Sequence, residues 1–512
     1  MAMLMATLKK IMKIVGAAMF VAVFIGLFMY LFFESDFVSF YERFTREDKT
    51  YPTDELVVVE PFPVQGLNPT VFNSFSRERL NNIYEPLIKP DRDLNMTPCL
   101  AISWGLLDDK IWEFNIRKNV KFHDGSSLDV LDVIESIDRA RFGEESELKD
   151  LLSTIKEVRR MDVDTIEVET YEPDPLLLQR LSTVYIFPEE WDGESVVGTG
   201  AFKYAEKKID SRFSFESFED YWGNKSFLKK AEMVSIIDKN GRLDALVNKG
   251  GHILSYVPYD LVEQIDTEKF DLVSVPSLEV QFLGFNFKGD LFKDLNLRKA
   301  VAMVVDSDEF AMYVGEYAHG VKQFVSSGVF GYNSDIKETI HDVKAAKELV
   351  EEAGAKGSEV SIILPVGLDA LGDYLTGRLD KIGLKTYVQY VKSEYLAESL
   401  EKMDFDIYFL GFKSELGDAS DFLKSIVHTK KEGYGQYNFA KYSNKEVDEL
   451  IEAQEVEMDS EKRLGLLQEA MRILVEDDVF GVPLLEYDTL YAAAKWLDFE
   501  PRIDGFIYIN DL

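Results

Sequence analysis

The chain has 512 residues, which is too long for one compact core, so we expect two or three lobes. Its 46% hydrophobic and 29% charged residues are typical of a globular protein and not of a disordered one. The formal net charge of -35 opposes binding to nucleic acid and favours cationic or zwitterionic small partners, while the single cysteine, Cys99, excludes an intramolecular disulfide and a cysteine-based zinc site.

The N-terminal segment contains an apolar run without charges at residues 14–33. As a helix this run would span about 30 Å, the thickness of a bilayer core. Lysines up to Lys13 precede it and Glu34 follows it, which predicts a short cytoplasmic N-terminus at 1–13 and the bulk of the chain outside. We favour an uncleaved anchor over a cleaved signal peptide, because the apolar core of a signal peptide is usually about 7–15 residues.

Residues 34–53 are polar and aromatic and are interpreted as a juxtamembrane spacer. Mixed α and β patterns follow, with apolar strand runs predicted at Glu55–Glu60, Thr165–Thr170, Ala231–Ile237, Glu359–Leu364 and Phe405–Phe412. Amphipathic spacing predicts one helix over Val343–Gly354 and two in succession over Ser443–Asp478. Because these patterns alternate without a repeat or a low-complexity linker, we expect interleaved α/β lobes.

The segment around the His-Asp pair at 123–124 has a structural explanation. Apolar and polar residues alternate over Trp112–Arg117, which predicts a half-buried strand. Gly125 then permits a turn with positive φ, and Ser126–Asp129 resembles a capping box at the start of a helix. We therefore interpret His123 and Asp124 as scaffold and not as a catalytic pair or metal ligands.

Catalytic motifs are not found in the sequence. The histidines lack the i, i+4 spacing of a zinc protease, and there is no nucleophile elbow, P-loop or Rossmann fingerprint. The Gly-Thr-Gly at 198–200 lacks a phosphate-binding lysine and is interpreted as a tight turn. The sequence therefore predicts a protein that is not an enzyme and uses no cofactor or metal.

Four collinear blocks carry a family resemblance. The region from Leu100 to Ala140 is similar to the signature of family 5 extracellular solute-binding proteins, the dipeptide, oligopeptide and nickel receptors of ABC importers. Its matching parts are Leu100–Trp104, Trp112–Arg117, Val120–Gly125 and the Asp132-Val133 step, and the later blocks are Val196–Lys225, Phe282–Phe310 and Leu410–Thr429. Ala201 replaces the proline of the family's Gly-Thr-Gly-Pro-Phe segment.

The resemblance implies an α/β, periplasmic-binding-protein-like type II (cluster C) fold with two lobes and an extra small lobe, here preceded by one transmembrane helix. The expected parts are lobe I at 54–94, 187–285 and 480–512, the small lobe at 95–186, and lobe II at 286–479.

Two acidic residues are candidates for holding a ligand's amino group. A buried ammonium group is tolerated only when a carboxylate pairs with it. By resemblance, the loop after Phe412 holds the amino terminus of a peptide, and Glu415 occupies the position where the peptide receptors carry aspartate. Asp418 falls at the acidic position before the family's proline, which is Ala419 here. For both residues the alternative is a solvated loop charge.

Aromatic residues in the same blocks complete the expected binding site. Phe412, Tyr221, Trp222 and Phe285 are predicted either to border the cleft and stack on the ligand or to fill the lobe cores. The resemblance also places Asn286 and Pro483 near the two crossings between the lobes, as hinge-proximal residues.

These observations predict a membrane-anchored extracytoplasmic protein that captures a peptide or other amine-bearing solute between its lobes and delivers it to ABC permease subunits. We expect a monomer that contacts the bilayer through its N-terminal helix and binds no nucleic acid. Two alternatives stay open: an anchored hydrolase of peptides or glycans, and a ligand-sensing receptor with the same fold. The family binds peptides, nickel complexes, sugars, opines and haem, so the fold does not fix the ligand.

Overall fold

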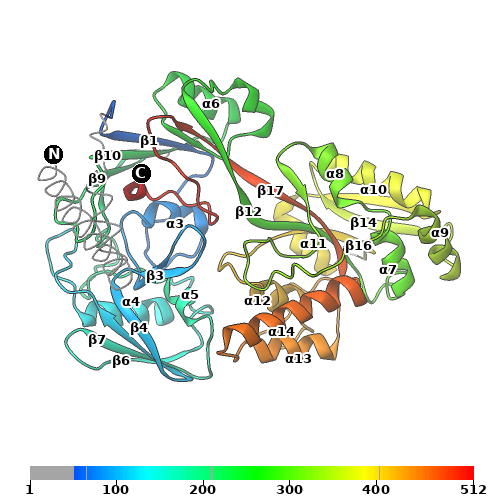
Figure 1. The fold of residues 1–512 in the computed structure, drawn as a ribbon, viewed down its shortest axis with the longest axis horizontal. Helices are drawn as coiled ribbons and strands as arrows, with labels where there is room; N and C mark the ends of the chain where they lie inside the picture. The colour runs from blue at the N-terminus through cyan, green and yellow to red at the C-terminus, as the bar shows by residue number, and fades with distance from the viewer. Residues whose placement is uncertain (1–50, 65, 209–211, 403) are drawn as a thin grey trace, which may run out of the picture. The chain divides into compact units, whose positions relative to one another are not determined.

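The computed structural model describes residues 51–512 except 65, 209–211 and 403 (Figure 1). The predicted segments 1–13 and 14–33 and most of the spacer at 34–53 lie outside the described residues. None of the helices in the described residues combines the length and the hydrophobicity that a membrane span requires. Asp54–Leu512 forms one compact unit.

An eleven-stranded sheet runs through this unit, in the order β15-β14-β16-β12-β17-β11-β1-β10-β9-β8, with β13 paired to β17. The strands are β1 (Glu55–Glu60), β8 (Phe202–Lys208), β9 (Arg212–Ser217), β10 (Lys230–Ser235), β11 (Ile253–Ser255), β12 (Phe270–Phe285), β13 (Ala318–Gly320), β14 (Glu359–Pro365), β15 (Lys385–Val391), β16 (Ile407–Lys413) and β17 (Gly481–Ala494). All five predicted strand runs are confirmed to within two residues at each end.

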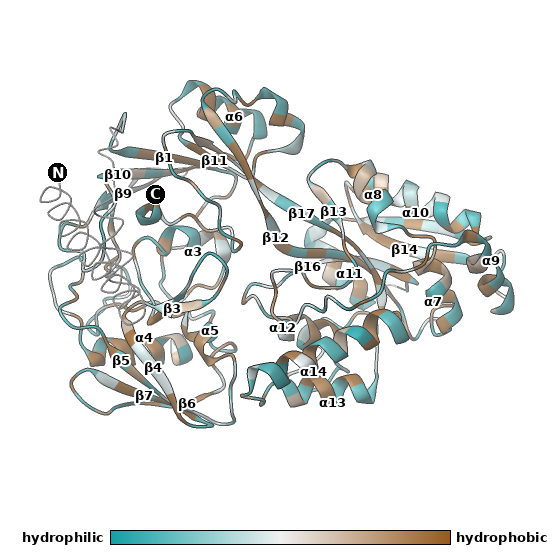
Figure 2. Ribbon diagram, in the orientation of Figure 1, coloured by the Kyte–Doolittle hydropathy of each residue, from teal (hydrophilic) through white to brown (hydrophobic). Residues whose placement is uncertain are grey.

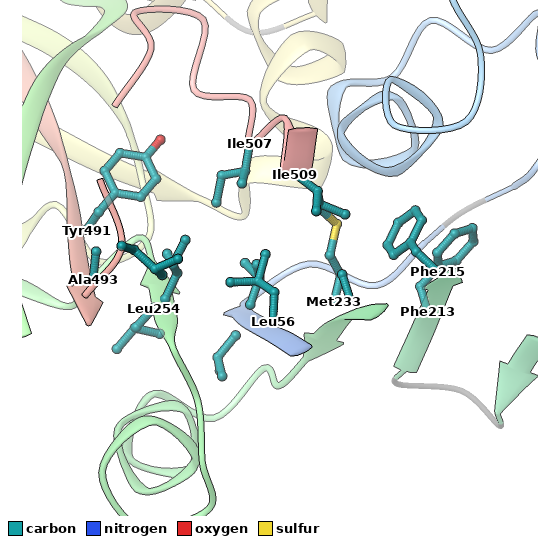
Figure 3. Close-up of a cluster of buried hydrophobic side chains, with 14 of the residues drawn as sticks. Leu56, Phe213, Phe215, Met233, Leu254, Tyr491, Ala493, Ile507 and Ile509 are labelled. Atoms are coloured by element: carbon teal, nitrogen blue, oxygen red, sulfur yellow. The ribbon is translucent and has the colours of Figure 1, made fainter. Parts of the chain in front are cut away.

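The first lobe is built around β1, which pairs in parallel with both β10 and β11. The continuous apolar run of β1 suits a strand buried on both faces. Its core gathers side chains from β1, β9, β10, β11, the end of β17 and the C-terminal segment, including Leu56, Phe215, Met233, Leu254 and Ile509 (Figure 3). The same core also receives side chains from helices α3 (Ser74–Leu80) and α6 (Lys239–Asn248), from the 3-10 turn Tyr259–Gln264 and from the terminal turn Ile509–Asp511.

The small lobe has its own antiparallel sheet in the order β4-β5-β7-β6. Its elements are β4 (Ala101–Asp108), β5 (Ile111–Ile116), α4 (Val130–Phe142), β6 (Ile155–Arg160), β7 (Thr165–Thr170) and α5 (Leu177–Leu181), and the hairpin of β2 (Ile88–Pro90) and β3 (Met96–Pro98) precedes them. The inward side chains Phe114 and Ile116 of β5 are buried, as the alternation predicts.

The start of α4 differs from the prediction. The capping box is formed by Asp129 and Asp132, each of which accepts a hydrogen bond from the other's backbone N–H. Ser126 instead donates its hydroxyl to Asp124 within the preceding turn. The cap lies later because Asp129 is the extended residue from which the helix begins.

The second lobe surrounds β14, β15 and β16 with helices α7 (Leu295–Ala302), α8 (Ser307–Val314), α9 (Val343–Glu352), α10 (Asp369–Lys381), α11 (Leu396–Lys402), α12 (Ser420–Phe422), α13 (Lys445–Gln454) and α14 (Ser460–Arg472), the 3-10 turn Ser393–Tyr395, and π turns at Leu423–Val427 and Ile473–Asp477. The predicted helix beginning at Val343 and the predicted helix pair are confirmed. Hydrophobic and hydrophilic residues alternate along α14 (Figure 2), as expected for a helix with one packed face.

Strands β12 and β17 pair antiparallel and run side by side from the first lobe into the second (Figure 1). Their register shifts between Pro276 and Val280, opposite Glu486–Asp488. Leu272 packs on the first-lobe core whereas Leu283 belongs to the second-lobe core, so the shift falls between the two cores. The predicted lobe boundaries at 285/286 and 479/480 stay predictions.

Candidate functional site

A small cavity, partly open to solvent, lies where the lobes meet within the unit and has a volume of about 60 Å³. Its lining includes Ser74, Arg77 and Asn81 of α3 and its end, Leu94 and Met96 of the β2–β3 hairpin, Gln179, Ser182 and Thr183 near α5, Leu278 of β12, Lys413, Glu415 and Leu416 after β16, and Asp504, Phe506 and Tyr508. A water needs about 10–15 Å³ of such space, so this cavity holds roughly five waters.

Glu415 is the exposed carboxylate of this cavity. Its Oε1 accepts a hydrogen bond of 2.9 Å from the Ser74 hydroxyl, which joins the loop after β16 to helix α3. The loop is shaped by a turn in which Gly417 N–H donates to the Ser414 carbonyl at 2.9 Å. Gly417 has φ +68 and a Cβ there would lie 2.6 Å from the Leu94 side chain, so the turn requires glycine. The structure thus leaves the Glu415 carboxylate available to a ligand in the cavity.

Asp418 lies three residues further on but has a different environment. Its side chain is buried and forms a bidentate ion pair with Arg463 of α14, at 2.7 and 2.9 Å. Asp418 Oδ1 also accepts from the Ser420 backbone N–H at 2.9 Å. The carboxylate is occupied by these donors and is not part of the cavity lining.

Tyr221 and Trp222 surround a buried acid, Glu85. The Tyr221 hydroxyl donates to Glu85 Oε1 at 2.9 Å and the Trp222 indole N–H donates to Oε2 at 2.8 Å. The Thr199 hydroxyl adds a third bond at 2.7 Å, and burial raises the pKa of Glu85 against these donors. Neither aromatic residue lines the cavity that holds Glu415.

The remaining aromatic candidates belong to the second-lobe core. Phe285 is fully buried and stacks on Phe292 with ring centroids 4.8 Å apart. Phe412 is half-buried and meets the edge of Phe422 at 5.5 Å. Both rings pack in or against the hydrophobic core of the second lobe, which is the alternative to ligand stacking that the sequence left open. Neither ring lines the cavity.

The two hinge-proximal candidates also lie in the second lobe. Asn286 donates its side-chain amide to the Phe405 carbonyl at 2.8 Å, and the Pro483 carbonyl accepts from the Ser307 hydroxyl at 2.6 Å. The register shift between β12 and β17 lies at Pro276–Val280, opposite Glu486–Asp488. The hinge-proximal role of the two residues stays a prediction.

His123 is held as scaffold. Its Nε2 lies 2.9 Å from the Gly200 carbonyl, and the Gly198 N–H points to Nδ1 at 3.4 Å. Burial lowers the pKa of His123 to about 4, so the ring is neutral at neutral pH. The glycines at 198 and 200 permit this packing, because a Cβ at either would lie within 2.7 Å of the Ile83 carbonyl oxygen.

Sequence reasoning missed two further buried charged groups. Arg79 forms a buried ion pair with Glu60 and donates to the Phe62 carbonyl at 2.7 Å, which anchors α3 to β1. Asp421 has a pKa raised to about 6 by burial and by the neighbouring Asp418 carboxylate. The Arg79–Glu60 pair joins residues 19 positions apart, and the pKa of Asp421 depends mainly on how its side chain is buried, so no local pattern indicates either feature.

Within the described residues, no group of three or more histidine, cysteine or acidic side chains is placed to hold a metal ion.

Comparison with known proteins adds an independent finding. The family model "Bacterial extracellular solute-binding proteins, family 5 Middle" matches residues 95–434. The chain is 24% identical over 459 residues to the dipeptide-binding protein of Escherichia coli, covering 80% of this chain and 85% of that protein. It is also 24% identical to heme-binding protein A of Haemophilus influenzae, over 86% of this chain and 87% of that protein.

Solved structures show the same architecture. HbpA2 from Haemophilus parasuis aligns with a TM-score of 0.80 at 18% identity, covering 89% of this chain and 99% of that chain. The ABC transporter-associated periplasmic binding protein DppA from Helicobacter pylori, in complex with peptide STSA, aligns with a TM-score of 0.68 at 21% identity, covering 89% and 98%. These likenesses show the mixed α/β fold of type II periplasmic binding proteins, and they confirm that part of the fold prediction.

Proposed function

Because the chain belongs to family 5 of the bacterial extracellular solute-binding proteins, we propose that it captures a peptide or other amine-bearing solute between its lobes and delivers it to an ABC importer. The relatives named above bind dipeptide and heme, and one solved neighbour holds a peptide. Binding without chemical conversion is therefore the proposed activity.

The observation that carries this proposal is the placement of Glu415. Its exposed carboxylate belongs to the second lobe and touches Ser74 of the first, so a ligand ammonium at this point would contact both sides of the cavity. A ligand that binds the closed arrangement better than the open one shifts the equilibrium toward closure. The permease would then recognise the closed form.

Membrane attachment is the second part of the proposal. The uncharged run at 14–33, with lysines before it and acids after it, supports a single-pass anchor with residues 54–512 outside the cytoplasm. Such an anchor would confine the binding unit near its permease.

The test is to identify the solute and remove its partner. Native mass spectrometry of the full chain, purified without refolding, is expected to reveal a co-purified amine-bearing solute. Glu415→Gln should weaken calorimetric binding of that solute by about 10²–10³-fold, because removing one partner of a desolvated ion pair costs about 3–5 kcal/mol. Glu432→Gln, an exposed residue that does not line the cavity, is the matched control and should leave the affinity unchanged. Hydrolysis of the solute on prolonged incubation would contradict the proposal.

A further inference from the structure

The cavity lining also contains a buried guanidinium group, that of Arg77, which lies one helical turn after Ser74 on α3. Arg77 is 8% exposed and therefore largely removed from water. Within the described residues it forms no ion pair with any carboxylate, and its Nη1 is buried without a hydrogen-bond partner. A buried guanidinium group in this state is costly, because it has lost its hydration without gaining an anion.

The other arginines around the cavity do not share this property. Arg79 pairs with Glu60, and Arg463 holds Asp418. Arg502 binds Asp504 at 2.6 Å, so the acid that lines the cavity beside Arg77 is already neutralised. In the part of the chain that the structure describes, the buried Arg242 and Arg298 have no ion pair, but each donates to two backbone carbonyls. The fold thus compensates its buried arginines with carboxylates or carbonyls, and Arg77 Nη1 has neither.

The neighbours of Arg77 cannot supply the missing charge. The rings of Phe72 and Tyr185 lie 5.7 and 5.5 Å from its guanidinium carbon, which gives cation–π stabilisation but no negative charge. Burial raises the pKa of Tyr185 to about 12, so its phenol stays neutral. The carboxylate of the adjacent Glu78 forms an ion pair with Arg79 instead, with 3.7 Å between Glu78 Oε2 and Arg79 Nη1.

Lys413 is the other cation of the cavity lining. Its charge lowers the pKa of both Glu78 and Glu279, against the raising effect of burial. Lys413 is also only half-buried and keeps part of its hydration, whereas the Arg77 guanidinium group has lost nearly all of its own.

We propose that Arg77 is the anion subsite of the cavity and binds the carboxylate of the solute whose ammonium group Glu415 takes. This inference rests on the proposed function and narrows its ligand class. Ser74, which touches Glu415, and Arg77 are i, i+3 neighbours with Cβ atoms about 5–6 Å apart. The cavity that both residues line has a volume of only about 60 Å³, which favours a short zwitterion, an amino acid or a dipeptide, over an oligopeptide.

The test offers the full chain three mixtures by native mass spectrometry: amino acids with dipeptides as free acids, the same compounds as C-terminal amides, and tetrapeptides as free acids. Retention from the first mixture alone is expected. Calorimetry with the retained compound and its amide should show the acid bound at least about 30-fold more tightly, as for truncation of a buried charge pair. In Arg77→Gln this preference should disappear, and in Arg77→Lys part of it should remain.

Arg472→Gln removes the same charge from an exposed ion pair outside the cavity and is the matched control. Unchanged melting temperatures would separate lost binding from lost folding, and the acid–amide preference is a ratio that misfolding alone would not alter. Equal affinity for acid and amide in the wild-type chain would overturn the Arg77 subsite while leaving solute binding intact. Selective retention of tetrapeptides would overturn the short-ligand class. Retention from none of the mixtures would overturn the inference, and a co-purified solute of another class would then preserve the proposed function.

Discussion

The substitution Asp418→Ala tests whether this carboxylate binds the ligand or stabilises the fold. Asp418 and Arg463 are 1% and 4% exposed, and two hydrogen bonds of 2.7 and 2.9 Å join them. Asp418→Ala leaves the Arg463 guanidinium buried without its anion, which costs about 3–5 kcal/mol. The Ser420 N–H loses its acceptor as well, adding about 1 kcal/mol, so we expect the free energy of unfolding to fall by about 4–6 kcal/mol.

Arg463→Met and the double variant complete a thermodynamic cycle. The double variant contains no buried charge without a partner. Its loss of unfolding free energy should therefore be smaller than the sum of the two single losses by about 2 kcal/mol or more. Urea unfolding of the full chain, followed by the fluorescence of its 5 tryptophans, measures all four proteins. A variant Asp418→Ala that unfolds like the wild type but no longer binds its solute would refute this reasoning and place Asp418 in the binding site.

Two further predictions concern pH. Burial lowers the pKa of His123 from 6.5 to about 4, so the unfolded state takes up this proton first and stability present above pH 6.5 is lost as the pH falls toward 4. The loss at pH 5 is about 2 kcal/mol, and urea unfolding of His123→Gln should lack that part of the difference between pH 7 and pH 5. The pKa of Asp421 is raised from 3.8 to about 6, so its favourable contribution is present below pH 3.8 and lost as the pH rises through 6. Asp421→Asn should therefore gain about 1–3 kcal/mol of stability at pH 7.5 relative to pH 4, and equal effects at both pH values would contradict the assigned burial.

Local patterns predicted the elements that depend on local physics. The apolar run of β1, the alternation along β5 and the spacing of α9 each appear in the sequence, because burial of one strand or helix face requires them. The capping box of α4 lies about one helical turn later than predicted. Several polar residues precede the helix, and any of them can accept hydrogen bonds from its free N–H groups.

The site was less predictable for a physical reason. Family resemblance located the loop of Glu415, but the partner of Asp418 is 45 residues away on α14. Likewise, Tyr221 and Trp222 converge on Glu85 across 136 and 137 residues. Whether a charged residue meets a ligand or another side chain depends on such distant contacts, and no local spacing encodes them.

Leu278 connects the cavity to the two strands that join the lobes. Leu278 lies in the register shift between β12 and β17, has φ +60, and lines the cavity. Its carbonyl accepts a hydrogen bond of 3.1 Å from Ser414, the residue before Glu415. A non-glycine residue in the left-handed region is strained, and such strain persists only where the surrounding structure imposes it. Rotation of the lobes about this bend would therefore carry the Glu415 loop with it, so the carboxylate would approach or leave Ser74 as the cavity closes or opens.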